Sequence, residues 1–115
     1  MLVADNAAYA NQLPENVAPL VAELGKNYSH ILAAATSNGK NILPRVAALL
    51  DVAQVSDVVA VEGPDTFRRP IYAGNAIISV TTPESAPVVA TVRTASWPEA
   101  PQTGSATVET VTVDA

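Results

Sequence analysis

Residues 29–50, SHILAAATSNGKNILPRVAALL, constrain the fold most, because an apolar run is followed by a polar turn and an amphipathic segment. The run 30–35 lacks the alternation of a half-buried strand, so it predicts a strand covered on both faces, in the middle of a parallel sheet. The apolar residues after the turn recur at helical spacing: Ile42, Val46, Leu49 and Leu50. This pattern predicts a helix that packs on the strand it follows.

The start of this helix is specified by the turn itself. The side-chain oxygen of Ser37 or Asn38 is expected to cap the helix by accepting a backbone N–H. Pro44 is compatible with the helix if it lies within or just after the first turn, where amides lack intrahelical acceptors.

The first half of the chain shows a repeated order of strand and helix. Residues 1–4 predict a short buried strand. A helix is expected from Asn16 or Val17 to Gly25, with Pro19 in its first turn. Two strand and helix units in succession predict parallel strands joined by right-handed crossovers.

From residue 55 onward the pattern changes to short strands separated by brief turns. Strands are expected at 58–61, 66–72, 76–81 and 88–94. Gly74 suits a turn or bulge that requires a positive φ. Brief turns between strands predict antiparallel pairing, so the second half is expected to form a β-meander added to the parallel core.

The composition limits both the core and the chemistry. A chain of 115 residues with 49% hydrophobic but only 4% aromatic residues predicts one core of close-packed small aliphatic side chains. The absence of cysteine excludes disulfides and thiolate metal sites, and a single histidine argues against a His-based zinc site.

The charge pattern limits the partners. The net charge is −5, and the 6 basic residues are scattered along the chain, which argues against nucleic-acid binding. No apolar run approaches the roughly 20 residues that span a bilayer, so direct membrane insertion is not expected.

Two polar sites invite a chemical interpretation. His30, the single imidazole, could act as a general base or proton shuttle, but a boundary residue at the entry of a strand is the favoured interpretation. The turn Ser37–Lys40 could bind phosphate through helix-start amides, yet SNGKN lacks both the GxxxxGK[ST] and the GxGxxG spacing.

Arginines and aromatic residues stand out in the second half. Arg68, Arg69 and Arg93 are expected to pair with carboxylates of a partner or of this chain, the nearby candidates being Asp57, Glu62 and Asp65. Tyr72 and Trp97 could stack a flavin or adenine ring, but packing against a turn is the favoured interpretation.

The acidic residues form no recognisable pattern. Asp5, Asp51, Asp57 and Glu62 lack the spacing of a catalytic carboxylate pair or a calcium loop. We therefore predict no catalytic, cofactor-binding or metal-ligating residue in this chain.

Three segments in succession carry a family resemblance. HILAAATSNGKNILPRVAALLDVAQVSDV, DTFRRPIYAGNAI and VRTASW, in this order, resemble the N-terminal domain of the electron transfer flavoprotein alpha subunit, over residues 1–97. The resemblance implies an α/β fold of parallel strand-helix units, Rossmann-like and adenine nucleotide alpha hydrolase-like, followed by an antiparallel β extension. It also implies a heterodimer with a beta subunit that carries one FAD between acyl-CoA-type dehydrogenases and a membrane quinone oxidoreductase.

The resemblance sets expectations for the organisation of the chain. Residues 1–97 are expected to be part of the family's N-terminal domain, which begins with two further strand and helix units. Residues 98–115 are expected to be a linker, with an extended strand over 107–113 that has no partner strand in this chain. The linker would lead to an FAD-binding domain that is absent from the sequence.

The function implied is that of a scaffold. FAD is expected in the intact protein and none on this fragment alone, which would dock on the beta subunit without catalysis of its own. The expected location is the cytoplasm of a bacterium or the mitochondrial matrix. Two alternatives stay open: a small nucleotide-binding module that uses the turn 37–40, and a remnant that self-associates through an open sheet edge.

Overall fold

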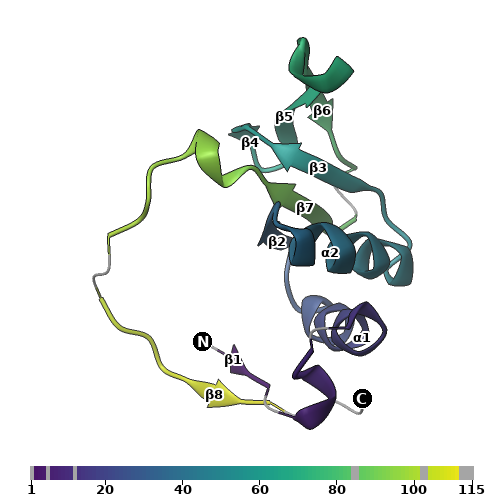
Figure 1. The fold of residues 1–115 in the computed structure, drawn as a ribbon, viewed down its shortest axis with the longest axis vertical. Helices are drawn as coiled ribbons and strands as arrows, with labels where there is room; N and C mark the ends of the chain where they lie inside the picture. Colours follow the sequence, from purple (N-terminus) through teal and green to yellow (C-terminus); the bar gives the residue numbers. More distant parts are fainter. Residues whose placement is uncertain (1, 5, 12, 84–85, 102–103, 112–115) are drawn as a thin grey trace.

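The computed structural model describes residues 2–4, 6–11, 13–83, 86–101 and 104–111, without the side chain of Ala8 (Figure 1). Its helices are α1 (Pro14–Gly25) and α2 (Ser37–Leu49). Its strands are β1 (Leu2–Val3), β2 (His30–Ala34), β3 (Gln54–Val58), β4 (Ala60–Gly63), β5 (Thr66–Ile71), β6 (Ala76–Thr81), β7 (Val88–Val92) and β8 (Glu109–Thr110).

The described strands form three separate sheets. The order in the largest parallel sheet is β2-β7-β3, and β4-β5-β6 form an antiparallel sheet. β1 and β8 make a parallel pair that lies away from both, near the amino end of α1 in Figure 1. The predicted α/β class, with parallel strand-helix units and an antiparallel addition, is confirmed.

The position of β7 differs from the prediction. We expected residues 88–94 in the antiparallel meander, but β7 lies between β2 and β3 and is parallel to both. Its first four residues are buried, as expected for a strand covered on both faces. The chain therefore returns from the antiparallel hairpin into the centre of the parallel sheet.

The predicted central position of residues 30–35 is wrong, because β7 takes the centre of the sheet instead. β2 is an edge strand, and its residues alternate between exposed and half-buried. Helices cover only one of its faces, and the apolar run does not by itself tell whether one or both faces are covered.

Both helices lie on the same face of the parallel sheet, with α2 packed on the sheet and α1 packed on α2. α2 lies between α1 and the sheet in the view of Figure 1, and the two helices share a cluster with β7 through Val46 and Val89, both fully buried. α1 contributes Ala18 and Ala22 to this cluster, and these small side chains allow the two helices to approach closely. Burial of these apolar side chains holds α1 against α2 and α2 against the sheet.

The antiparallel sheet packs on the other face. Phe67 of β5 enters a second cluster with Val58, Val88 and Ala90, and half-buried Val80 of β6 completes it. The largest fully buried side chains of the described residues are three valines and Thr91. The prediction of a core built from small aliphatic residues is confirmed.

The helix starts differ from the sequence predictions. The N-cap of α2 is Thr36, whose Oγ1 accepts from Gly39 N at 3.3 Å, and neither Ser37 nor Asn38 serves as the cap. α2 starts early enough that Pro44 lies inside it, on its exposed side.

α1 also starts earlier than predicted. It begins at Pro14 instead of Asn16 or Val17, which places Pro19 in the helix interior instead of the first turn. Pro14 suits this start because the first helical amide has no intrahelical acceptor.

The carboxyl end of α2 is closed by a Schellman motif. Val52 N donates to Ala47 O at 2.9 Å and Asp51 N donates to Ala48 O at 3.2 Å. Asp51 adopts φ 56°, the left-handed conformation that this motif usually gives to glycine.

The pair of β1 and β8 departs from two expectations. Leu2 and Val3 are 38% and 37% exposed, so the first strand is not buried. Glu109 pairs with Leu2 and Val111 N donates to Val3 O at 2.7 Å, so this part of the predicted strand 107–113 has a partner in the chain. Residues 112–113 of that prediction lie outside the described residues.

The junction between the two larger sheets is a bulge. A single strand was predicted over 58–61, but Asp57 adopts φ 53° and the register shifts between Val55 and Val58, so β3 ends there. Val59 N then donates to Arg68 O at 2.9 Å, which starts the antiparallel sheet. The bulge turns the chain from one sheet into the other.

The hairpin strands follow the sequence more closely. β6 has the predicted bounds 76–81, whereas β5 ends at Ile71, one residue before the predicted end. Gly74 has the predicted positive φ, 91°.

Candidate functional site

The amino end of α2 is the place where the sequence allowed an anion site. Lys40 Nζ lies 3.7 Å from Oδ1 of Asp57, and the two side chains are 56% and 24% exposed. Asp57 therefore pairs with this lysine, whereas we had expected it to pair with an arginine. A carboxylate beside the ammonium group opposes the positive charge that a phosphate would require.

Close packing explains why residue 39 is a glycine. A Cβ atom built on Gly39 would overlap the carbonyl oxygen of Ala34, at the end of β2. The first turn of α2 thus lies directly against the strand, which explains this glycine without a ligand.

A cavity of about 260 Å³ lies between α2 and β3. Its walls include Thr91, whose Oγ1 accepts from Asp57 N at 3.0 Å, and Gln54, whose Nε2 donates to Ser56 Oγ at 2.8 Å. Oε1 of Gln54 is the one buried side-chain atom without a hydrogen-bond partner in the part of the chain that the structure describes. Gln54 lines this cavity and a second one of about the same volume.

His30 has a structural role that matches the favoured interpretation. It is the exposed first residue of β2, and its Nε2–H donates to the carbonyl oxygen of Pro64 at 2.6 Å. Ser29 Oγ donates to Nδ1 at 2.7 Å, since the carbonyl fixes the proton on Nε2. The ring joins β2 to the β4–β5 turn.

The arginines hold the hairpin to the parallel sheet or lie at the surface. Arg69 Nε donates to Ser56 O at 2.9 Å, which ties β5 to β3. Arg68 forms the predicted type of surface pair, 3.5 Å from Glu62. Arg93 is exposed, and its backbone N–H donates to Val58 O.

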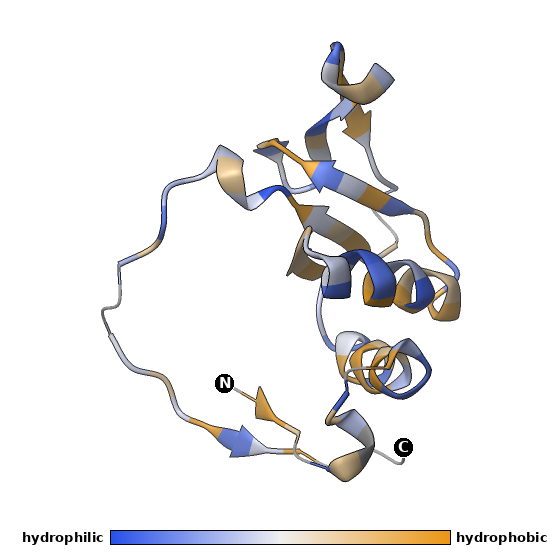
Figure 2. Cartoon of the chain, in the orientation of Figure 1, coloured by the Kyte–Doolittle hydropathy of each residue, from blue (hydrophilic) through white to orange (hydrophobic). Residues whose placement is uncertain are grey.

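The outer end of the β5–β6 hairpin carries exposed apolar side chains. Tyr72 is 80% exposed, so the prediction that its ring packs is wrong. Tyr72 and Ala73 both adopt the left-handed conformation, with φ 53° and 51°, followed by Gly74. Ile77 and Ile78 are 53% and 38% exposed, and β6 is largely orange in Figure 2. We call residues 71–78 the hairpin arm, which lies farthest from α1 in Figure 1.

The other aromatic candidate is less exposed. Trp97 is 37% exposed and follows the 3₁₀ turn Thr94–Ser96. Tyr72 and Trp97 lie on different elements, the hairpin arm and the segment after β7.

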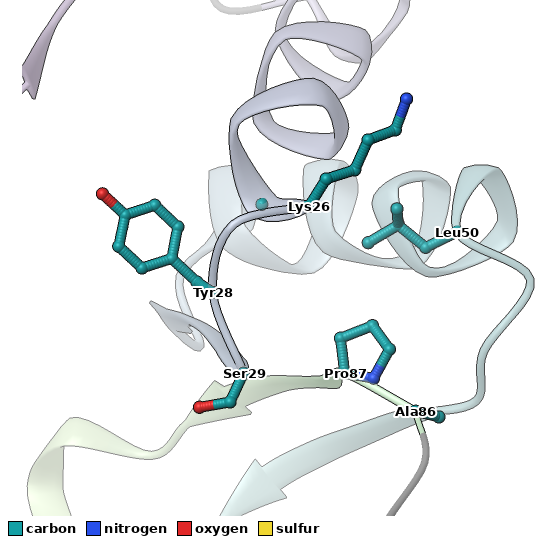
Figure 3. Close-up of a pocket in the computed structure, with 7 residues that line it drawn as sticks. Lys26, Tyr28, Ser29, Leu50, Ala86 and Pro87 are labelled. Carbon is teal, nitrogen blue, oxygen red and sulfur yellow. The ribbon is translucent and has the colours of Figure 1, made fainter.

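A cavity of about 450 Å³ lies at the amino ends of β2 and β7 (Figure 3). Ligands of parallel α/β sheets bind at the opposite end, beyond the carboxyl ends of the strands. In Figure 3 the Tyr28 ring and the Ser29 hydroxyl point away from Leu50 and Pro87. Lys26 Nζ is paired with Glu23 at 2.9 Å.

These residues do not fit a flavin. The two cavities that Gln54 lines are each about 260 Å³, smaller than the roughly 300 Å³ that drug-sized ligands need, and FAD is larger still. The larger cavity places no converging polar groups toward an isoalloxazine or a pyrophosphate. We therefore derive no flavin chemistry from the described residues.

Among the described residues, no three side chains of His, Asp or Glu come together as a metal site would require. Neither described helix has the length and apolar character needed to cross a bilayer.

Comparison with known proteins defines the class. The family described as "Electron transfer flavoprotein domain" matches residues 1–115, and the chain belongs to this family. The fold agrees with it, since parallel strand-helix units and an antiparallel sheet are both present.

The relatives narrow the class to one subunit. The chain is 67% identical over 112 residues to the electron transfer flavoprotein subunit alpha of Pseudomonas aeruginosa, covering 96% of this chain and 36% of that protein. It is 52% identical to the subunit alpha of Paracoccus denitrificans, over 94% of this chain and 35% of the relative. It is 47% identical to the mitochondrial subunit alpha of Arabidopsis thaliana, over 98% of this chain and 32% of the relative. The chain thus spans about a third of the length of the curated relatives it matches.

Proposed function

We propose that this chain is the scaffold part of an electron transfer flavoprotein alpha subunit and that it docks on the beta subunit. The observation that carries the proposal is the 67% identity, over 96% of the chain, to a protein named as this subunit. In the intact protein the flavin would be FAD, held by residues outside this chain.

The polar contacts support a scaffold without catalysis. The side chains best suited to chemistry hold the backbone: Arg69 binds a carbonyl of β3, and Thr91 accepts an amide at the bulge. His30 binds the carbonyl of Pro64. Thr91 and His30 also line cavities, but these hydrogen bonds commit their side chains to the backbone.

The hairpin arm is the proposed docking element for the beta subunit. Its residues Tyr72, Ile77 and Ile78 are exposed, and two non-glycine residues keep a left-handed conformation that costs about 1–3 kcal/mol each. Exposed apolar surface is usually found where a partner binds. We infer that Tyr72 and Ile77 become buried against the beta subunit.

The wider role follows from the resemblance. The intact heterodimer would take electrons from acyl-CoA-type dehydrogenases and pass them to a quinone oxidoreductase. The relatives include bacterial proteins and one named as mitochondrial, which supports the bacterial cytoplasm or the mitochondrial matrix as the location.

Affinity co-purification with the cognate beta subunit tests the docking role. We expect the tagged chain to retain the beta subunit, and Tyr72→Ser with Ile77→Ser to weaken retention at least about 10-fold, since buried aromatic anchors dominate interfaces. Leu49→Ser is the matched control, because Leu49 is 52% exposed on α2, away from the arm. Equal retention by the arm variant and the control would contradict the arm as docking element, while no retention by the unmodified chain would contradict the docking role itself.

A further inference from the structure

The antiparallel sheet has two edges that are built differently. β4 forms one edge, where the register shifts between Val61 and Gly63 and where Glu62 carries a charge. Bulges and charges are devices by which proteins prevent unwanted pairing of an edge strand. β6 forms the other edge, and it pairs with β5 over its whole length without a register shift. The β6 edge therefore lacks the devices that the β4 edge has.

Hydrogen bonds between β5 and β6 fall on every second pair of facing residues. Thr82 N donates to Asp65 O at 2.8 Å, directly beyond the pair that Thr81 makes with β5. The pair of Thr81 is therefore of the other kind, in which the N–H and C=O groups point away from the facing strand. In steps of two along β6, the same holds for Ser79 and Ile77.

The facing residues of β5 agree with this alternation. Arg68 faces Ser79, and its carbonyl oxygen accepts from Val59 N at 2.9 Å, on the β4 side. Pro70 faces Ile77 and has no N–H to donate. Among the described strands, β5 is the only neighbour of β6, so the outward backbone groups of β6 have no strand beside them.

The surface along this edge is uncharged and partly apolar. Residues 70–83 contain no Asp, Glu, Lys or Arg. Ile77 is 53% exposed and belongs both to β6 and to the hairpin arm, whose Tyr72 is 80% exposed. The exposed apolar surface of the arm thus continues into the open edge.

The open edge lies away from the first and last described strands. β1 and β8 pair with each other near α1, whereas the hairpin of β5 and β6 is the part farthest from α1 in Figure 1. A strand added beside β1, β8 or β2 would join another sheet and leave the outer side of β6 unchanged.

We propose that a strand of the beta subunit pairs with the β6 edge and extends the antiparallel sheet to four strands. This inference rests on the proposed docking of the hairpin arm and states how that docking is achieved. The outward groups of Ile77, Ser79 and Thr81 would supply main-chain hydrogen bonds to the added strand. The Tyr72 ring would pack on the same partner, beyond the end of that strand.

The arm favours the beta subunit over a second copy of this chain as the occupant. Two copies that paired antiparallel through β6 would have their arms at opposite ends of the shared ladder. The Tyr72 ring of each copy would then stay exposed. One partner that covers β6 and the arm together buries the apolar side chains and satisfies the open backbone groups.

Hydrogen exchange tests the pairing, read by NMR on the isotope-labelled chain with and without its cognate beta subunit. In the free chain, we expect fast exchange of the outward amides of Ile77, Ser79 and Thr81. In the complex these amides should exchange at least about 100-fold more slowly, because each lies in a hydrogen-bonded ladder. The amides of Ile78 and Val80 point toward β5, so they serve as internal controls and should exchange slowly in both samples.

Ser79→Pro tests the backbone contact separately. It removes an N–H that β5 does not use, and proline is tolerated on the open side of an edge strand. We expect it to weaken binding of the beta subunit at least about 10-fold, with an unchanged circular dichroism spectrum. Ser79→Ala is the matched control, because it loses the hydroxyl that donates to Glu62 but keeps the N–H, and it should bind like the unmodified chain.

The outcomes separate this inference from the docking role. If the beta subunit binds but exchange at the outward amides is unchanged, strand pairing is overturned and docking stands. Equal binding by Ser79→Pro and Ser79→Ala has the same meaning. If the proline variant does not fold, the exchange measurement decides, because it uses the unmodified chain.

Two further results would go against the beta subunit as the occupant. Failure of the unmodified chain to bind the beta subunit would overturn both the docking role and the strand pairing. Slow exchange of the outward amides in the chain alone at about 100 µM would assign the edge to a second copy.

Discussion

Gly39 of α2 lies directly against the carbonyl oxygen of Ala34, the last residue of β2, so that the helix starts in contact with the strand it follows. The contact leaves no room for a side chain at this position. It also explains why the turn after β2 contains glycine although no phosphate motif is present.

We expect Gly39→Ala to lower the free energy of unfolding by about 1–3 kcal/mol, because its methyl group would displace the backbone at the end of β2. Helix propensity alone would predict a gain of about 1 kcal/mol, so the sign of the change distinguishes the two effects. Urea denaturation monitored by circular dichroism measures it. Gly63→Ala is the control, because open space surrounds Gly63, and it should change the stability by less than about 0.5 kcal/mol.

Thr36 should be the residue that caps α2. Thr36→Ala is expected to cost about 1 kcal/mol, because Gly39 N loses its side-chain acceptor, whereas Thr36→Ser should retain most of the stability. Ser37→Ala should change little, because Ser37 does not serve as the cap. A larger loss for Ser37→Ala than for Thr36→Ala in the same urea titration would contradict the observed cap.

Asp51 offers a stabilising substitution. Asp51→Gly should raise the unfolding free energy by about 0.5–1 kcal/mol, because glycine adopts the left-handed conformation of the Schellman motif without strain. Asp51→Ala serves as the comparison and should not raise it. A lower midpoint of thermal unfolding for Asp51→Gly would show that the aspartate side chain makes a contribution that the conformational argument omits.

The neighbouring arginines should differ in importance. Arg69→Met should cost about 1–2 kcal/mol, since the Ser56 carbonyl loses a charged donor where β5 meets β3. Arg68→Met should change the stability by less than about 0.5 kcal/mol, because its pair with Glu62 is largely exposed. Denaturant titration of both variants gives the comparison, and equal losses would argue against the role of Arg69 in joining the sheets.

The sequence predicted local elements better than their partners. The amphipathic stripe of α2 and the bounds of β6 follow from periodicity and turn residues that lie within one segment. The pairing of β7 could not be read in this way, because its neighbours β2 and β3 lie more than 30 residues away along the chain. The apolar residues 88–90 at the start of β7 did carry a signal of burial on both faces, which the short turns before them obscured.

Of the candidate site, the sequence could predict the residues of one segment but not the contacts between distant segments. The motif spacing argued against the phosphate interpretation of the turn 37–40, but it could not show that Lys40 pairs with Asp57, which β3 brings near only in the folded chain. The exposure of Tyr72 was missed because a single aromatic residue beside glycine packs in some turns and protrudes in others.

Titration calorimetry of the purified chain with its cognate beta subunit, beside a titration with FAD alone, tests the scaffold role most directly. We expect a 1:1 complex with a dissociation constant of about 1 µM or tighter for the beta subunit, and no heat of binding for FAD. The account would be contradicted by a chain that ignores the beta subunit but binds FAD stoichiometrically.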